Sequence, residues 1–366
     1  MTLFFIAGEK SGDLHASQII RQIKVAQPNV QIYGWGGEAM KKDGTTILQT
    51  QDAFGVMGFS AILGKLFQFK SLLRTCKRQL LELRPEVVIL VDFSGFNMRV
   101  ARIAKKLGIK VCYYIPPKTW AWGAWRLSGL RKLTDEVLCI FPFEESYFRK
   151  HQVKAHFIGN PTFEQLEHIY PVKEESLPSS PLPIAVLPGS RIQEVKTCVP
   201  VIAGLARKYP NYQFKLAAVS HLGAAAYSPV SEIPNVQLKW DDSTEVLRHS
   251  RAAVVNSGTA TLEAALLGIP QIVIYQTSWV NYYLAKWMLQ ITYISLVNIL
   301  LNEKVVSECI QGQCNVEVVA QELDELLHCE KRQKKISEGY SEIRKMLAGK
   351  QASKEAAERI LALCRS

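Results

Sequence analysis

The chain has 366 residues, of which 48% are hydrophobic and 21% charged; this excludes a disordered chain and is typical of a folded protein with more than one domain. No run of 18 apolar residues occurs, so we expect no transmembrane helix, and the first residues predict a buried strand rather than a signal peptide. The net charge of +11 belongs mainly to the first half, because residues 1–165 hold 23 Lys and Arg against 13 Asp and Glu, whereas residues 166–366 hold 21 against 20.

Apolar runs alternate with helical stretches along the first half of the chain, which indicates βαβ units and a parallel sheet. The expected strands are 3–7, 30–33, 86–91, 110–115 and 136–140. A glycine-rich turn follows the first strand, but it lacks the GxGxxG and GK[ST] patterns of dinucleotide and ATP sites. The turn instead offers groups that can contact a sugar or an acceptor phosphate, namely Glu9, Ser11, Gly12 and Asp13.

An amphipathic, basic helix is expected over residues 59–78, where apolar residues recur at helical spacing among lysines and arginines. Most such stripes pack in a core, but the basic first half makes a membrane-surface interpretation equally well supported. On that interpretation the membrane-facing residues are Phe59, Ile62, Leu63, Lys65, Leu66, Phe67, Lys70 and Arg74. A second apolar, aromatic segment, 279–289, raises the same two interpretations.

Polar and aromatic side chains follow two strands of the first half. Asp92 comes directly after the strand 86–91, and a carboxylate at the carboxyl end of a parallel strand is well placed for general-base work. A simple cap for the helix expected over 97–107 is the competing interpretation. Trp120 and Trp122 follow the strand 110–115 at the same sheet edge, where aromatic rings stack on sugars and pack against acyl chains.

A segment with four prolines, 170–183, predicts a linker, after which the strand–helix pattern restarts. The expected strands are 184–187, 213–219, 236–239, 252–255 and 271–275, and residues 317–364 are helical in pattern. We therefore predict the α/β class, with two doubly wound, Rossmann-like domains whose parallel sheets face a shared cleft. The predicted parts are a first domain over 1–168, a linker over 169–183, a second domain over 184–345 and a C-terminal helix over 346–366. That helix packs either on the first domain or on a second subunit of a homodimer.

Two strand–turn–helix junctions in the second half are candidates for binding a diphosphate. The turn 188–191, Pro-Gly-Ser-Arg, puts free backbone N–H groups, a hydroxyl and a guanidinium at one helix N-terminus. The turn 257–259, Ser-Gly-Thr, begins another helix, and Glu263 one turn later can accept two ribose hydroxyls. An ordinary helix cap explains the second turn equally well, but the pair together favours a nucleotide diphosphate.

Short motifs in a fixed order resemble the lipid-A-disaccharide synthase family, which are bacterial glycosyltransferases of the GT-B class. The resemblance covers roughly residues 3–345, and its specificity comes from the number and order of the motifs. The motifs are Ala7-Gly8-Glu9-Lys10-Ser11-Gly12-Asp13, Gly34-Trp35-Gly36-Gly37 with Met40, Val56-Met57-Gly58, Asp92 with Phe96-Asn97, Trp120-Ala121-Trp122, Phe141-Pro142-Phe143-Glu144, Leu187-Pro188-Gly189-Ser190-Arg191 with Glu194, Ser257-Gly258-Thr259-Ala260 with Leu262-Glu263, and Ser295-Leu296 with Asn298.

The resemblance implies a metal-independent, inverting reaction. UDP-2,3-diacylglucosamine is the donor and 2,3-diacylglucosamine 1-phosphate the acceptor, and the products are the β-1,6-linked lipid A disaccharide phosphate and UDP. Asp92 matches the family's catalytic carboxylate, which would deprotonate the 6-hydroxyl of the acceptor. The nucleotide would be bound by Gly189, Ser190, Arg191, Ser257, Gly258, Thr259, Glu263 and Asn298. The segment near 59–80 matches the part of the family that contacts the membrane.

The chain departs from the family pattern at several positions. Gly95 stands where a second Asp is usual, so a mechanism with two carboxylates is in doubt here. Gly123 replaces a common Arg after Trp-Ala-Trp, and Asn160 replaces a frequent His, which removes that His as a base. Gln276 and Val297 replace a usual basic residue and a usual Pro.

Two other classes of function remain open at this point. One is another GT-B enzyme that acts on UDP-N-acetylglucosamine, either a 2-epimerase or the peptidoglycan N-acetylglucosaminyltransferase. The other is a non-catalytic protein that binds a membrane surface or nucleic acid, although no nucleic-acid motif is present. The scattered cysteines and histidines show no disulfide framework, CxxC pair or HExxH pattern, so we expect no metal and no other cofactor. We expect a cytoplasmic protein bound peripherally to an anionic inner-membrane surface.

Overall fold

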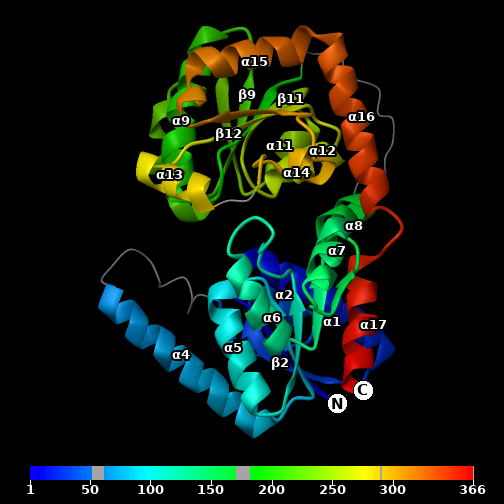
Figure 1. Cartoon of the computed structure of the whole chain (residues 1–366). Coiled ribbons are helices and arrows are strands. Elements are labelled where there is room, and N and C mark those ends of the chain that lie inside the picture. The colour runs from blue at the N-terminus through cyan, green and yellow to red at the C-terminus, as the bar shows by residue number, and fades with distance from the viewer. Residues whose placement is uncertain (52–61, 170–181, 289–290, 366) are drawn as a thin grey trace. The chain divides into compact units, whose positions relative to one another are not determined.

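The computed structural model describes residues 1–51, 62–169, 182–288 and 291–365, with the side chains of residues 62–67, 168–169 and 284–285 left undescribed. The chain forms two compact units, each built around its own sheet (Figure 1). The first unit is Met1–Glu164 together with Gly349–Ser366, and the second is Gln165–Ala348. The predicted linker over 169–183 lies almost wholly outside the described residues.

The first unit contains a seven-stranded parallel sheet of order β3-β2-β1-β4-β5-β6-β7. The chain order reverses between β1 and β4, so the loops that follow these two strands meet at the carboxyl edge of the sheet. The strands are β1 (Thr2–Ala7), β2 (Gln31–Gly36), β3 (Thr46–Thr50), β4 (Val87–Val91), β5 (Lys110–Tyr114), β6 (Glu136–Cys139) and β7 (Ala155–Phe157).

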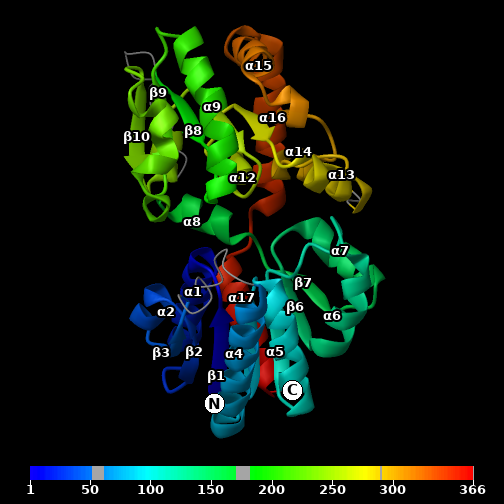
Figure 2. The same ribbon diagram turned by 90° about the vertical axis from the view of Figure 1, so that its left-hand side faces the viewer.

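Helices pack against the sheet of this unit (Figure 2), and one apolar core lies on each face of the sheet. Along β1, Leu3, Phe5 and Ala7 point toward α1 and α17, whereas Phe4 and Ile6 point toward α4, α5 and α6. Burial on both faces explains why the strands appear in the sequence as continuous apolar runs. The helices of this unit are α1 (Lys10–Ala26), α2 (Glu38–Lys42), α4 (Ile62–Leu83), α5 (Ser94–Lys106), α6 (Leu127–Leu133), α7 (Pro142–Lys150) and α17 (Ala352–Arg365), and α8 (Pro161–Ile169) spans the boundary between the units.

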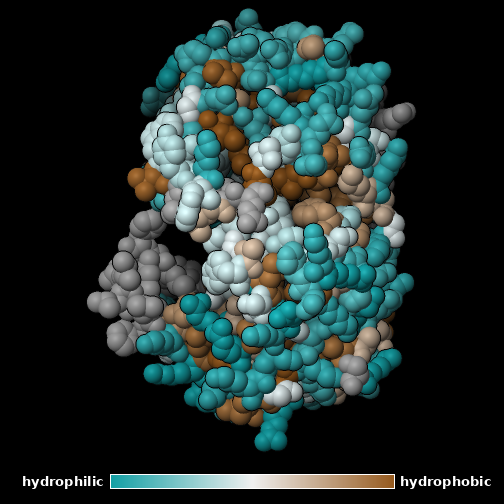
Figure 3. Space-filling view, in the orientation of Figure 1, coloured by the Kyte–Doolittle hydropathy of each residue, from teal (hydrophilic) through white to brown (hydrophobic). Residues whose placement is uncertain are grey.

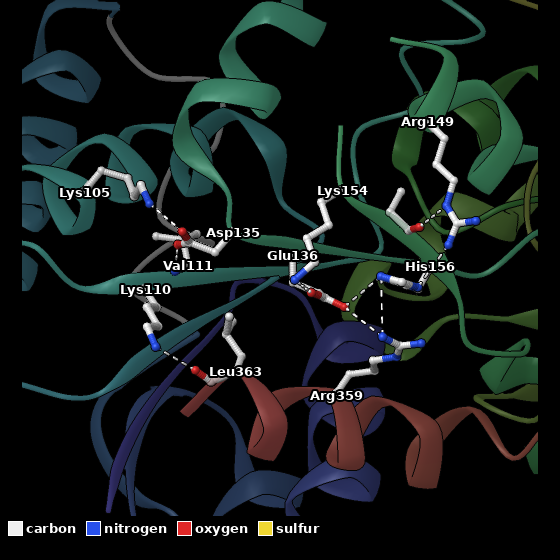
Figure 4. A network of polar contacts seen from close by, with 11 residues as sticks. Lys105, Lys110, Val111, Asp135, Glu136, Arg149, Lys154, His156, Arg359 and Leu363 are labelled. Carbon is white, nitrogen blue, oxygen red and sulfur yellow. Dashed lines mark hydrogen bonds and ion pairs between the residues drawn. The ribbon is translucent and has the colours of Figure 1, made fainter. Parts of the chain in front are cut away.

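The last helix, α17, returns to the first unit and packs against α1. A polar network also ties it to the sheet (Figure 4). Arg359 Nη1 lies 3.6 Å from the Glu136 carboxylate of β6, which is itself 3.2 Å from His156 Nε2. Lys110 Nζ donates a hydrogen bond of 3.0 Å to the backbone oxygen of Leu363. The C-terminal helix is therefore an integral layer of the first unit.

The second unit contains a six-stranded parallel sheet of order β10-β9-β8-β11-β12-β13. Its strands are β8 (Ile184–Leu187), β9 (Phe214–Ala218), β10 (Val236–Trp240), β11 (Ala252–Asn256), β12 (Gln271–Tyr275) and β13 (Ser307–Ile310). Its helices are α9 (Ile192–Lys208), α10 (Ser228–Ser231), α11 (Ser243–Arg248), α12 (Ala260–Leu266), α13 (Trp279–Met288), α14 (Leu296–Leu301), α15 (Val316–His328) and α16 (Glu330–Leu347). An apolar cluster joins β8, β9 and β11 to α11 and α12, while α9 and α15 contact β12.

All ten strands expected from the sequence are confirmed, and among the described residues three further strands were missed: β3, β7 and β13. Each missed strand lies at an edge of its sheet. An edge strand pairs on one side only and need not form a continuous apolar run, so β3 reads as Thr-Ile-Leu-Gln-Thr and β7 has only three residues.

The basic amphipathic helix is confirmed as α4, but the described part of its apolar stripe faces the protein. Phe69 packs edge-on against Phe96 at 5.5 Å, and Cys76 and Leu80 are fully buried. The core interpretation is therefore correct for this part, whereas Lys70 and Arg74 are exposed as expected. The side chains of Phe59, Ile62, Leu63, Lys65, Leu66 and Phe67 lie outside the described residues. Within the described ranges, no helix is long and apolar enough to cross a membrane.

Candidate active site

Asp92 occupies a strained turn at the carboxyl end of β4. Asp92 and Phe93 have φ angles of 45° and 43°, a left-handed conformation that costs about 1–3 kcal/mol for each non-glycine residue. Three hydrogen bonds hold the turn: Asn97 Nδ2 donates to the backbone oxygens of Val91 (3.0 Å) and Asp92 (2.8 Å), and Tyr113 Oη donates to that of Asp92 (2.8 Å). Strain that the surroundings maintain in this way is typical of functional sites.

The glycine-rich turn after β1 lies directly beside the Asp92 turn. A Cβ atom at Gly8 would come within 2.6 Å of the Phe93 ring, so only glycine fits there without a shift. Glu9 and Ser11 are exposed at this edge. Asp13, in contrast, is buried, and its carboxylate accepts hydrogen bonds from the backbone N–H groups of Gly37, Ala39 and Met40. This carboxylate therefore has a structural role at the start of α2, and its contact with the acceptor stays a prediction.

The electrostatics of the Asp92 turn favour a carboxylate of increased basicity. Burial raises the pKa of Asp92, and the positive charge of Lys118 and the Phe93 N–H lower it in part. Lys118 also acts on Glu144, a buried carboxylate whose pKa burial raises to about 6. Trp120 Nε1 donates to Glu144 at 3.0 Å, which fixes the position of that indole. Lys118, which lies on the loop that follows β5, is thus near two carboxyl groups, those of Asp92 and Glu144.

The structure shows the surroundings of two positions at which the chain departs from the family pattern, Gly95 and Asn160. A Cβ atom at Gly95 would meet no other described atom within 4 Å, so the space of the usual second Asp is open. Asn160 is buried and caps α8, accepting hydrogen bonds from the backbone N–H groups of Thr162 and Phe163. Nothing in the structure explains the replacements at Gln276 and Val297.

In the second unit, the β8–α9 turn and the β11–α12 turn lie side by side. Gly189 has a φ angle of 102°, and a Cβ atom there would lie 2.3 Å from Glu194 Oε2 and 2.9 Å from Asn256 Nδ2. The two predicted diphosphate turns are therefore brought together, because β8 and β11 are neighbours in the sheet.

The prediction of free N–H groups at the β8–α9 turn is wrong in this structure. Glu194 Oε2 accepts hydrogen bonds from the backbone N–H groups of Ser190 (3.0 Å) and Arg191 (3.2 Å). The Arg191 side chain is 78% exposed, with Nη1 3.7 Å from Glu194. Arg191 is the N-cap of α9 and Glu194 its N3 residue, the position from which an acidic side chain reaches back in a capping box, so a Glu three residues after the turn is a weak sequence signal for this cap. An anion that uses these N–H groups has to displace the Glu194 carboxylate.

The β11–α12 turn keeps several groups available for a ligand. Gly258 and Thr259 are exposed, while Ser257 Oγ donates to the backbone oxygen of Ile294 at 3.0 Å. Glu263 is partly buried, burial raises its pKa, and its carboxylate has no hydrogen-bond partner among the described residues. Such a carboxylate is suited to accept hydroxyl groups of a ligand.

Asn298 has a structural role within the second unit. Its side chain is completely buried, its amide nitrogen donates to Val306 O and Glu308, and its amide oxygen accepts from the N–H groups of Val305 and Val306. Because its hydrogen-bonding capacity is used internally, the predicted direct contact with the nucleotide has no free group to make it. Glu308, which also accepts from the backbone of Ser295, was missed by the sequence reasoning and orders the loop before α14.

Solved structures share this arrangement of two parallel-sheet units. The UDP-GlcNAc 2-epimerase of Methanocaldococcus jannaschii, in complex with UDP-GlcNAc and UDP, matches with a TM-score of 0.66 at 14% identity and covers 99% of both chains. The glycotransferase of kitacinnamycin matches with a TM-score of 0.63 at 16% identity, covering 99% of this chain and 98% of the other. At these identities the likeness is one of fold, and it defines the GT-B class of glycosyltransferases and epimerases.

Sequence relatives narrow the class to one family. The family model described as Lipid-A-disaccharide synthetase matches residues 3–363. The lipid-A-disaccharide synthase of Anaeromyxobacter sp. (strain K) is 34% identical over 376 residues, which cover 99% of this chain and 97% of that protein. That of Myxococcus xanthus (strain DK1622) is 31% identical, with the same coverage. The chain belongs to the lipid-A-disaccharide synthase family and is a glycosyltransferase of lipid A synthesis.

Proposed function

We propose that this enzyme transfers the sugar of UDP-2,3-diacylglucosamine to the 6-hydroxyl of 2,3-diacylglucosamine 1-phosphate, with inversion at the anomeric carbon. The products are the β-1,6-linked lipid A disaccharide 1-phosphate and UDP. The observation that carries the proposal is the Asp92 turn, in which a carboxylate of raised pKa is held under strain at the carboxyl edge of the sheet. Membership of the family supports the same reaction.

Asp92 acts as the general base in this proposal. It accepts the proton of the acceptor's 6-hydroxyl while that oxygen bonds to the anomeric carbon of the donor. The bond between that carbon and the diphosphate oxygen breaks, and UDP leaves with the electron pair. Because burial raises the pKa of Asp92, its carboxylate is a stronger base than an exposed aspartate once it is ionised.

In this proposal the β8–α9 turn stabilises the departing diphosphate. The exposed guanidinium of Arg191 and the hydroxyl of Ser190 approach it, and the diphosphate takes the place of the Glu194 carboxylate on the N–H groups of the turn. Gly258 and Thr259 complete the phosphate contacts, and Glu263 accepts the ribose hydroxyls. On the acceptor side, Trp120 and Trp122 with Glu9 and Ser11 surround the second sugar.

The enzyme binds an anionic membrane surface in this proposal, on the cytoplasmic face of the inner membrane. Both substrates are amphiphiles, so the enzyme has to reach them at a lipid surface. Exposed cations line the described part of α4, namely Lys70, Arg74, Lys77 and Arg78. Attraction to anionic lipids contributes about 1 kcal/mol for each such residue near the surface.

Helix α13 supplies an aromatic surface suited to the same purpose. Trp279, Val280, Tyr283 and Trp287 are exposed by 56%, 78%, 61% and 84% of their surface, and the rings of Trp279 and Tyr283 stack at 5.9 Å. The space-filling view shows a pale to brown surface over α13 (Figure 3). Trp and Tyr favour the membrane interface because one end of each ring system is apolar and the other polar. No Asp or Glu occurs from residue 264 to residue 302, so this segment does not repel anionic headgroups.

The reaction is tested by measuring UDP release from the purified protein supplied with both diacylated glucosamine substrates. We expect the wild type to release UDP and Asp92→Asn to lose about 100-fold to 10,000-fold in rate, the usual contribution of a general base. Glu358→Gln, which removes an exposed carboxylate of α17, is the matched control and should keep wild-type activity. Full activity in Asp92→Asn would remove its role as base.

The same assay separates the other GT-B chemistries. A 2-epimerase converts UDP-N-acetylglucosamine without an acceptor, so it gives a new UDP-sugar and no acceptor-dependent UDP. A peptidoglycan N-acetylglucosaminyltransferase releases UDP from UDP-N-acetylglucosamine but not from the diacylated donor. Release that depends on both diacylated substrates supports the present proposal.

A further inference from the structure

Arg126 carries a positive charge that the described part of the chain does not neutralise. It ends the short 3-10 turn Ala124–Arg126, and its guanidinium lies 3.8 Å from the ring centroid of Trp122 and 5.6 Å from that of Trp125. Its Nε is buried without a hydrogen-bond acceptor, and no described carboxylate lies within ion-pair distance. A desolvated donor without a partner is costly, so the site favours an added acceptor.

The backbone next to Arg126 is shaped around the guanidinium. Gly123 has a φ angle of 76°, and a Cβ atom there would lie 2.7 Å from Arg126 Nε and 3.0 Å from Nη2. The absence of a side chain at Gly123 therefore makes room for the guanidinium. With Trp122 on one side and Gly123 on the other, the cation is held in one position rather than extending freely into solvent.

The cation and the Asp92 turn share one neighbour, Tyr113. Burial lowers the pKa of Arg126 and the nearby Tyr113 hydroxyl raises it, while the same Tyr113 Oη donates to the backbone oxygen of Asp92 at 2.8 Å. Lys118 adds a second exposed cation close to Asp92 on the same loop. A ligand that presents a hydroxyl to Asp92 therefore meets positive charge on the side of β5.

The geometry points to Arg126 as the group that binds the phosphate of a phosphorylated acceptor sugar, with Trp122 and Trp125 as the aromatic platform. This inference rests on the proposed function, whose acceptor is a sugar 1-phosphate. A guanidinium forms paired, charge-assisted hydrogen bonds with phosphate oxygens, and such an ester would supply the acceptor that Nε lacks. The residue then selects phosphorylated over unphosphorylated acceptors, while Asp92 performs the chemistry.

Calorimetric titration with two water-soluble probes, glucosamine 1-phosphate and glucosamine, tests the inference on the full chain. We expect the wild type to bind the phosphorylated sugar at least about ten-fold more tightly, and Arg126→Gln to lose that preference, because a charged hydrogen bond is worth about one to two powers of ten in affinity. Gly123→Ala should give the same loss, since its Cβ displaces the guanidinium without removing the charge. Lys132→Gln, an equal charge loss at an exposed site on α6, should keep the preference.

Three results overturn the inference: no preference for the phosphorylated sugar in the wild type, an unchanged preference in Arg126→Gln, or a loss of UDP affinity in Arg126→Gln. The last result would assign the residue to the leaving nucleotide. Far-ultraviolet circular dichroism checks that each variant is folded, and Arg126→Lys, which keeps the charge, should retain part of the preference. Absence of UDP release from the wild type with both lipid substrates would refute the proposed function, and the sugar-binding comparison would still stand or fall separately.

Discussion

At the scale of single residues, an energetically unfavourable backbone conformation positions Asp92. Two consecutive non-glycine residues with positive φ angles, at 45° and 43°, turn the chain sharply after β4. Asn97 and Tyr113 hold the backbone oxygen of Asp92 from two sides. Neither residue need touch a substrate in this arrangement, because each acts by fixing the direction of the carboxylate.

The pH dependence of the reaction should report the environment of Asp92. Since a protonated Asp92 accepts no proton, kcat/KM should fall as the pH drops through its pKa, which burial raises. Lys118 lowers that pKa in part, so Lys118→Gln should raise it and move the acid limb of the pH profile to higher pH. Lys132→Gln should leave the limb in place. A limb that stays fixed in Lys118→Gln would show that Asp92 does not control it.

Removal of the Asn97 amide should affect catalysis more than binding of the donor. Asn97→Ala removes the amide donor from the backbone oxygens of Val91 and Asp92, and only the Asp92 oxygen keeps a second side-chain donor, Tyr113 Oη. The loss should cost about 1–3 kcal/mol of unfolding free energy and loosen the strained turn. We expect a lower kcat with an unchanged KM for the UDP-sugar, measured as UDP release, alongside urea denaturation. Asn315→Ala removes the cap of α15 in the other unit at a cost of about 1 kcal/mol and should leave kcat unchanged. Equal losses of kcat in both variants would mean that stability alone explains the effect.

At the scale of elements, α4 and α13 resolve differently the choice between core and membrane that both of their sequences leave open. The described apolar side chains of α4 pack against α5 and leave its cations outside, whereas α13 exposes its aromatic residues. Both are amphipathic at helical spacing, and that spacing does not state which face a neighbouring layer covers. The sequence could therefore predict two amphipathic helices but could not decide between core and lipid for either of them.

Exposed valines at two sites provide a matched test of the α13 surface. Val280 of α13 is 78% exposed and Val25 of α1 is 76% exposed, so a Val→Ser change alters each surface by the same amount. We expect Val280→Ser to weaken binding to anionic phospholipid vesicles several-fold in a sedimentation assay, while Val25→Ser has no effect. Trp287→Ser should weaken binding about ten-fold or more, because a large buried side chain contributes about 1.5–3 kcal/mol. Equal effects at Val280 and Val25 would argue against a membrane role for α13.

At the scale of the whole molecule, the first unit is discontinuous in sequence. Its sheet is complete by Phe157, but the core between the sheet and α1 is closed by α17, which follows the entire second unit. Glu164 and Ser353 secure the return, since the backbone N–H of Ser353 donates to Glu164 at 2.8 Å. The stability of the first unit therefore depends on the last residues of the chain.

Truncation of one core side chain on α17 should destabilise the first unit. Ile360 is completely buried against the sheet, and Ile360→Ala should cost about 2–5 kcal/mol. Lys354→Ala, on the exposed face of the same helix, should change the free energy of unfolding by less than about 0.5 kcal/mol. Thermal unfolding followed by circular dichroism measures both variants. An Ile360→Ala protein as stable as the wild type would show that α17 does not close this core.

The sequence by itself determined the α/β class, ten of the strands, the family and the identity of Asp92 as a candidate base. These features follow from continuous apolar runs and from short motifs, which are local properties of the chain. Only the tertiary structure decided that Asp13 and Asn298 make internal hydrogen bonds, that Glu194 occupies the N–H groups of the predicted anion-binding turn, and that Arg126 has no ion-pair partner among the described residues. The physical reason is that a polar group's availability depends on which partners the fold brings within hydrogen-bonding distance, and those partners are in most cases remote in the chain.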